Sequence, residues 1–153
     1  MPLGIGIFVF IIDQLVKLFV VSTMHIGQSI PVIDGIFSIT YVLNPGAAFG
    51  MLEHQRWIFI LAAMGVMMIA AVCYRHIQRE NMFIRCGSGL LLGGAAGNLA
   101  DRIQTGLVID FFDFHIWPVF NLADIAICVG AGILIWHIWQ RRTADEDKDK
   151  FYS

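Results

Sequence analysis

The stretch Trp57–Tyr74, WIFILAAMGVMMIAAVCY, holds no charged residue and is long enough to cross a membrane as a helix. A hydrocarbon core of about 30 Å takes about 20 residues of helix. Three further stretches have comparable length and apolar character, namely residues 3–21, 84–100 and 119–139. The sequence therefore predicts an all-α integral membrane protein with four transmembrane helices.

The composition of the whole chain supports this prediction. Of 153 residues, 58% are hydrophobic and only 14% are charged, whereas soluble domains carry about 25% charged residues. A soluble domain of this size exposes too much of its surface to hide so many apolar side chains. The formal net charge of −2 offers no basic surface for nucleic acid. We expect one membrane domain over residues 1–140, a charged tail over 141–153, and a monomer.

Lysine and arginine are spread unevenly along the chain. Because cytoplasmic segments carry an excess of both residues, we expect both termini in the cytoplasm and residues 22–56 and 101–118 on the outer side. The tail, RRTADEDKDK, is expected to be solvated and poorly ordered. Seven of the ten basic residues lie after the second span or in the tail: Arg75, Arg79, Arg85, Arg141, Arg142, Lys148 and Lys150.

The first outer segment has the pattern of a small β-hairpin. Residues 30–33 and 36–43 are rich in β-branched and aromatic side chains, and Asp34-Gly35 separates them. Asp-Gly between two such runs is typical of a tight hairpin turn. We therefore expect a small extracytoplasmic β-hairpin platform on the membrane surface.

Glycine recurs at four-residue spacing in the third predicted span, at Gly89, Gly93 and Gly97. Small residues at this spacing lie on one face of a helix and let a neighbouring helix approach closely. The sequence predicts that this face is a packing seam.

Acidic residues at membrane depth are costly, so they mark candidate functional sites. Two of them belong to a repeated tetrapeptide, Asn98-Leu-Ala-Asp101 and Asn121-Leu-Ala-Asp124, in which Asn and Asp share a helix face. The acids that need an explanation, all near the outer ends of the spans, are Asp13, Asp101, Asp110, Asp113 and Asp124.

Asp110 lies in the aromatic and β-branched run VIDFFDF, where burial raises the pKa of a carboxyl. A second carboxylate nearby would leave one group protonated and the other ionised. Such a pair can hydrolyse a peptide, because the ionised group takes a proton from water while the protonated group polarises the carbonyl.

Other interpretations of these residues remain open at this point. The acids could form structural ion pairs, Asp13 with Lys17 and Asp101 with Arg102. Asp110, Asp113 and His115 have metal-ligand chemistry, although we expect His115 at the membrane interface beside Trp117. A small proton-coupled transporter or channel subunit could use the same acids as a relay.

The order and spacing of five short motifs resemble the lipoprotein signal peptidases (signal peptidase II) of bacteria. The resemblance runs from about Ile12 to Trp139, on a frame of four spans. The motifs are Asp13–Lys17 (DQLVK), Asn44–Gly50 (NPGAAFG), Gly93–Arg102 (GGAAGNLADR), Gly106–Phe111 (GLVIDF) and Phe120–Asp124 (FNLAD).

This resemblance implies an aspartyl endopeptidase of the bacterial cytoplasmic (inner) membrane that works without a metal or other cofactor. Its substrate would be a prolipoprotein cut just before a diacylglyceryl-modified cysteine. It further implies Asp110 and Asp124 as the catalytic pair, although the repeat makes Asp101 with Asp124 a tempting alternative. The residues implied in substrate binding, or in supporting the pocket, are Asp13, Lys17, Asn44, Gly46, Asn98, Asp101, Arg102 and Asn121.

Overall fold

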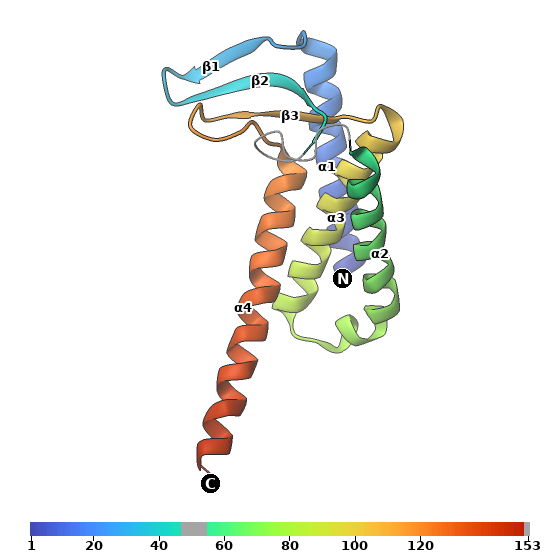
Figure 1. Ribbon diagram of the computed structural model, residues 1–153, viewed down its shortest axis with the longest axis vertical. Coiled ribbons are helices and arrows are strands. Elements are labelled where there is room, and N and C mark those ends of the chain that lie inside the picture. Colours follow the sequence, from blue (N-terminus) through green and yellow to red (C-terminus); the bar gives the residue numbers. More distant parts are fainter. Residues whose placement is uncertain (47–54, 152–153) are drawn as a thin grey trace.

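A computed structural model of the chain describes residues 1–46 and 55–151, with side chains described up to residue 143. The described residues form four helices and three strands. The helices run alongside one another, and the strands form a layer across one end of the bundle (Figure 1). In chain order the elements are α1 (Pro2–Thr23), β1 (Ser29–Ile33), β2 (Phe37–Asn44), α2 (Arg56–Arg79), α3 (Met82–Gln104), β3 (Val108–Asp113) and α4 (Leu122–Phe151).

Three of the described helices are long and apolar enough to span a membrane: α1, α2 and the Leu122–Thr143 part of α4, with mean hydropathies of 2.2, 2.3 and 1.8. Helix α3 has 23 residues, but its glycines and polar residues lower its mean hydropathy. It lies between the other helices, and many of its residues are buried against them. The fold is thus mostly helical and apolar, with three such spans and a small sheet.

The glycine face of α3 packs directly against α1, as the spacing predicted. A Cβ atom added to Gly93 would lie 2.5 Å from the carbonyl oxygen of Gly6, and one added to Gly89 would lie 2.7 Å from that of Pro2. On a neighbouring face of α3, Gly87 meets α4, where a Cβ on Gly130 would lie 2.6 Å from the Gly87 oxygen. Small residues therefore hold α3 in contact with both neighbouring helices.

The sheet contains the predicted hairpin and one strand more. β1 and β2 pair antiparallel, and Gly35 in the turn between them has a φ of 71°, a backbone conformation that glycine adopts at little cost. The addition is β3, which pairs antiparallel with β2, so that Asp110 lies opposite Val42. The sequence pattern that predicts a hairpin is local, but the partner strand of β3 lies more than sixty residues earlier in the chain. The pairing of β3 with β2 could therefore not be predicted from that pattern.

A small core joins the sheet to the first helix. Val20 and Met24 at the end of α1 are buried against Tyr41 of β2 and Phe111 of β3. Because Phe111 is fixed in this core, the adjacent residue of β3, Asp110, is held on the opposite face of the strand.

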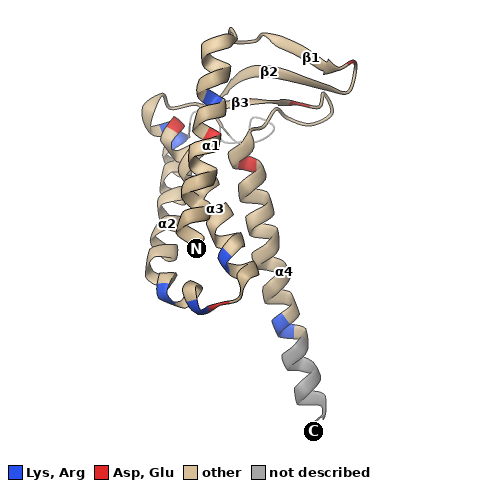
Figure 2. Ribbon diagram, turned by 180° about the vertical axis from the view of Figure 1, so that it is seen from behind, with Lys and Arg blue, Asp and Glu red and all other residues tan. Residues whose placement is uncertain are grey.

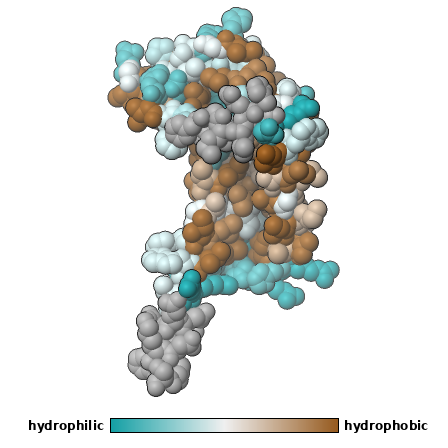
Figure 3. Space-filling view, viewed as in Figure 1, coloured by the Kyte–Doolittle hydropathy of each residue, from teal (hydrophilic) through white to brown (hydrophobic). Residues whose placement is uncertain are grey.

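Charged residues gather toward the two ends of the helical bundle (Figure 2), and the surface between them is mostly hydrophobic (Figure 3). At the end away from the sheet, Arg141 of α4 forms an ion pair with Glu80, which lies between α2 and α3. Beyond this pair α4 continues as a helix to Phe151.

Candidate active site

A cavity of about 450 Å³ lies where the sheet meets helices α2, α3 and α4. One wall is apolar and comes from α2, α3 and α4, with small residues such as Ala62 and Ala95. The other wall is polar and contains six of the residues implied by the sequence motifs: Asn44, Gly46, Asn98, Arg102, Asp110 and Asp124.

Asp110 enters this cavity from strand β3 and is only 1% exposed. One carboxylate oxygen accepts a hydrogen bond from Asn44 Nδ2 at 2.8 Å, and the other accepts one from Asn121 Nδ2 at 2.6 Å. Burial, followed by the nearby charge of Asp124, raises the pKa of Asp110 to about 7. A carboxyl group with this pKa is protonated in a large share of molecules at neutral pH.

Asp124 enters from the first turn of α4 and is half-buried. Its Oδ1 accepts a hydrogen bond from Asn98 Nδ2 at 2.7 Å, and its Oδ2 accepts one from the backbone N–H of Asn121 at 3.2 Å. Asn121 in turn accepts from the backbone N–H of Asp124 at 2.9 Å. This reciprocal arrangement resembles a capping box at a helix N-terminus, and it fixes the direction of both side chains.

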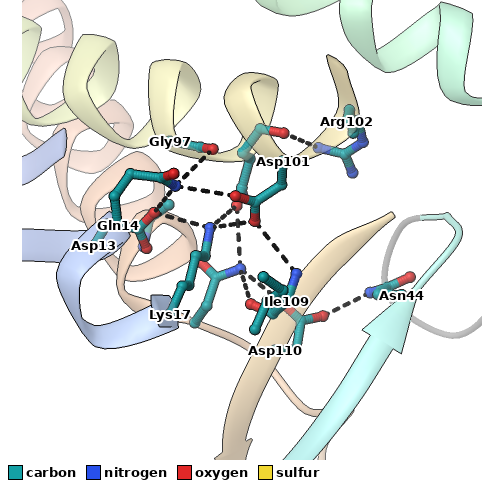
Figure 4. Close-up of polar contacts among 12 residues, drawn as sticks. Asp13, Gln14, Lys17, Asn44, Gly97, Asp101, Arg102, Ile109 and Asp110 are labelled. Atoms are coloured by element: carbon teal, nitrogen blue, oxygen red, sulfur yellow. Dashed lines mark hydrogen bonds and ion pairs between the residues drawn. The ribbon is translucent and has the colours of Figure 1, made fainter. Parts of the chain in front are cut away.

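Three other predicted site residues form a buried ion cluster behind the cavity (Figure 4). Lys17 Nζ lies 2.8 Å from Asp13 Oδ2 and 2.8 Å from Asp101 Oδ2. None of the three is among the residues that line the cavity. Asp13 also accepts from the backbone N–H of Ala123 at 2.9 Å, so the cluster ties α1 and α3 to the start of α4.

The position of Asp101 bears on the choice of acidic pair. Its oxygens accept from Gln14 Nε2 at 3.0 Å and from the backbone N–H of Ile109 at 3.3 Å. Within the described residues, Asp101 forms its ion pair with Lys17. Arg102 is adjacent to Asp101 in α3, and adjacent residues of a helix do not share a face. Asp101 therefore lies outside the cavity, and Asp110 lies inside it with Asp124.

Arg102 extends into the cavity. Its Nη2 donates to the backbone oxygen of Gly46 at 3.2 Å, and its guanidinium lies 4.5 Å from the centre of the Phe59 ring. Asn44 and Gly46 are described, but residues 47–50 of the second motif lie outside the described residues.

Asp113 and His115 lie at a different place from Asp110. Asp113 accepts from Thr40 at 2.8 Å and lies 3.3 Å from His115 Nδ1. His115 Nε2 is 3.2 Å from the hydroxyl of Ser38, which is 4% exposed. These groups connect β2 to the loop after β3, and Asp110 is not among their contacts.

Sequence reasoning did not single out Gln14, which lies in the ion cluster behind the cavity, or Phe59, which lines the cavity. Gln14 donates to Asp13, Asp101 and the backbone of Gly97, and Phe59 stacks on Arg102. Gln14 lies within the first motif, so its polar amide in an apolar span was a usable signal. The approach of Phe59 to Arg102 depends on tertiary packing and leaves no signal in the sequence.

Comparison with known proteins agrees with the motifs. A family model described as signal peptidase (SPase) II matches residues 5–140. A lipoprotein signal peptidase of Desulfitobacterium hafniense is 48% identical over 134 residues, which covers 86% of this chain and 87% of the relative. One from Halothermothrix orenii is 45% identical over 133 residues, covering 87% and 91%.

A solved bacterial membrane enzyme, determined by the in meso method at 2.3 Å resolution, superposes with a TM-score of 0.86 at 32% identity, covering 94% of this chain and 90% of that one. A second such structure, at 1.9 Å resolution, gives a TM-score of 0.80 at 33% identity, covering 90% and 91%. By its motifs, its fold and these relatives, the chain belongs to the signal peptidase II family.

Proposed function

We propose that this protein is a lipoprotein signal peptidase that cleaves the signal peptide from diacylglyceryl-modified prolipoproteins, immediately before the lipidated cysteine. The observation that carries the proposal is that two aspartates from different elements, Asp110 and Asp124, line one cavity beside apolar helices. The apolar wall of the cavity suits a substrate whose signal peptide is embedded in the bilayer.

In the proposed reaction Asp124 is the general base and Asp110 the general acid. Ionised Asp124 takes a proton from a water molecule, which then attacks the scissile carbonyl, while protonated Asp110 donates a hydrogen bond to the carbonyl oxygen. When the tetrahedral intermediate collapses, the C–N bond breaks and Asp124 gives the proton that it took from water to the leaving amine. The raised pKa of Asp110 supports this assignment, because a buried carboxyl with a second one nearby keeps its proton.

The remaining polar residues of the cavity would bind the peptide. An extended signal peptide in a bilayer has few partners for its backbone groups, and the amides of Asn44 and Asn98 can supply them. Arg102 offers a fixed fork of donors to a backbone carbonyl or a lipid ester. Gly46 would allow close approach of the substrate, and Asn121 would hold Asp110 in place. The buried cluster of Asp13, Lys17 and Asp101 would support this wall.

We further propose that α3 is the fourth membrane crossing. Its 23 residues extend about 34 Å at the rise of an α-helix, and it packs along α1. The arginines at the end away from the sheet favour a cytoplasmic location for that end and for both termini. The cavity would then open near the outer face of a bacterial inner membrane, and the protein would act as a monomer.

A gel-shift cleavage assay with purified protein in detergent tests the proposed function. We expect cleavage of a diacylglyceryl-modified prolipoprotein, no cleavage of its unmodified precursor, and no effect of a metal chelator. Asp110→Asn and Asp124→Asn should each abolish cleavage while the protein keeps its thermal unfolding temperature within a few degrees. Full processing by folded Asp124→Asn would refute the mechanism.

The proton-relay alternative is less well supported by the distribution of charges. Between the acids near the sheet and the arginines at the opposite end, the helices carry no Asp, Glu, Lys or Arg. If folded wild-type protein cleaved no prolipoprotein, proton flux into liposomes would be the measurement to make next.

A further inference from the structure

Lys17 is a buried cation for which the proposed reaction has no direct use. It is 2% exposed and does not line the cavity. Its three N–H groups are matched by three acceptors: Asp13 Oδ2 and Asp101 Oδ2 at 2.8 Å each, and Asn98 Oδ1 at 3.0 Å. The third of these contacts leads toward the catalytic pair.

The amide of Asn98 is held in a single orientation by what surrounds it. Its Oδ1 accepts from Lys17 at 3.0 Å and from Asn121 Nδ2 at 3.1 Å, and its Nδ2 donates to Asp124 Oδ1 at 2.7 Å. Turning the amide over would direct its NH₂ group at an ammonium and its oxygen at a carboxylate. Both contacts would be repulsive, because an ammonium has no acceptor and an ionised carboxylate has no donor.

The amide of Asn121 is fixed from the other side. Its Oδ1 accepts from the backbone N–H of Asp124 at 2.9 Å, so its Nδ2 must face Asp110 Oδ1 at 2.6 Å and Asn98 Oδ1. Because Asn98 receives this donor as well as that of Lys17, the two amides support each other. Asp124 therefore faces the NH₂ group of Asn98, and Asp110 faces that of Asn121. The orientation of both amides is fixed by contacts on their other sides.

We propose that Lys17 is a positioning residue for the peptidase reaction: it holds the amide of Asn98 so that Nδ2 donates to Asp124 and fixes the direction of the carboxylate that acts as the base. The proposal rests on the proposed function, since it takes Asp124 as the base. Lys17 would act without contact with the substrate, so its removal should change kcat rather than KM.

A purely structural role for Lys17 makes a different prediction. Removing it would leave Asp13 and Asp101 buried without their cation, which is strongly destabilising, but any variant that still folded would keep its kcat. Lys17 could also act on the two aspartates directly through its charge. In that case the effect of removing Lys17 would not depend on whether Asn98 is present. The charged groups that act on Asp124 from the elements around it include Arg102 of α3 and Asp110 of β3, and both remain in the variants below.

The test is a double-mutant cycle between Lys17→Met and Asn98→Ala, measured as cleavage of lipidated prolipoprotein. We expect Lys17→Met to lower kcat about 10- to 100-fold, the range that corresponds to one hydrogen bond to a charged group. KM should change less than about threefold. With Asn98→Ala already present, Lys17→Met should cost less than about twofold more.

Loss of folding must be kept separate from loss of positioning. If Lys17→Met does not fold, the same cycle is run with Asp101→Asn in all four proteins, because this change gives the Lys17→Met proteins the net charge that the cluster has in wild type. Gln14→Met is the matched control, because Gln14 contacts the same two carboxylates but not Asn98. It should lower the unfolding temperature and leave kcat within about twofold.

Three results would overturn the proposal: an unchanged kcat in a folded Lys17 variant, additive effects in the cycle, or a kcat for Gln14→Met as low as that for Lys17→Met. Each requires that wild-type protein cleaves the substrate and that Asp124→Asn does not. Failure of those two controls would instead count against the proposed function.

Discussion

Asn121 Nδ2 lies 2.6 Å from Asp110 Oδ1, and this contact joins the start of helix α4 to strand β3 across the floor of the cavity. Asn121 is fully buried, and the same NH₂ group also lies 3.3 Å from the backbone oxygen of Ile109. The two aspartates come from different elements, and Asn121 contacts both, since its Oδ1 also accepts from the backbone N–H of Asp124. Asn121 therefore helps to set the geometry of the candidate catalytic pair, together with Asn44 and Asn98.

The first prediction concerns Asn121 itself. Asn121→Asp keeps the shape of the side chain but replaces the donor to Asp110 with a third carboxylate, and like charges at this distance repel. We expect cleavage to fall at least 100-fold and the free energy of unfolding to fall by about 1–3 kcal/mol, the cost of an unpaired buried polar group. Cleavage rates and thermal unfolding in detergent measure both effects.

Ser38→Ala is a suitable control for that variant. It also removes a buried polar group, one that contacts His115 outside the cavity, and should leave cleavage within about twofold. Equal losses of activity in the two variants would show that the contact between Asn121 and Asp110 is not the cause of the loss.

The second prediction follows from the pKa of Asp110, which burial raises from 3.8 to about 7. Because the folded state favours the protonated form, this group contributes stability that is fully present below pH 3.8 and is lost as the pH rises to about 7. Cleavage should also decline above pH 7, when the general acid loses its proton.

The measurement is the unfolding temperature of wild type and Asp110→Asn between pH 5 and 8. Wild type should lose stability over this interval, and the variant, which has no carboxyl to ionise there, should lose less. Parallel curves for the two proteins would contradict the assignment of the change to Asp110.

The third prediction tests the packing between α1 and α3. A Cβ at Gly93 would lie 2.5 Å from the Gly6 oxygen and 2.8 Å from Val9 Cβ, so Gly93→Ala must push the helices apart. Overpacking of this kind costs about 1–3 kcal/mol. Thermal unfolding in detergent should show a clear loss of stability.

Gly65→Ala is the matched control, since it also lies in a helix but has nothing within 4 Å of its added Cβ. It should be neutral or stabilising, because alanine favours a helix over glycine by about 1 kcal/mol. An equal loss in both variants would mean that Gly93 matters for some reason other than close approach.

Much of this fold could be predicted from local patterns. The β1–β2 hairpin followed from Asp34-Gly35, and the packing face of α3 followed from the spacing of its glycines. Asp13 and Lys17 lie four residues apart on α1, so their ion pair was also visible in the sequence.

The parts that could not be predicted depend on contacts between distant segments. The joining of β3 to β2 requires a partner more than sixty residues away, for which periodicity carries no information. An ion pair between Asp101 and its neighbour Arg102 was one interpretation that the sequence left open, whereas the structure pairs Asp101 with Lys17 on another helix. Two charged residues that are adjacent in the sequence of a helix need not lie close together, because adjacent side chains point in different directions.

The last prediction concerns Arg102, whose guanidinium donates to the Gly46 oxygen and stacks on Phe59. Arg102→Lys keeps the positive charge but loses the planar fork and the stacking surface. If Arg102 binds the substrate rather than the reacting water, the loss should appear as a rise in KM of about tenfold with a smaller change in kcat. Arg75→Lys, an exposed change at the opposite end of the bundle, should alter neither constant. A fall in kcat with KM unchanged would instead indicate that Arg102 acts in the transition state, close to the scissile bond.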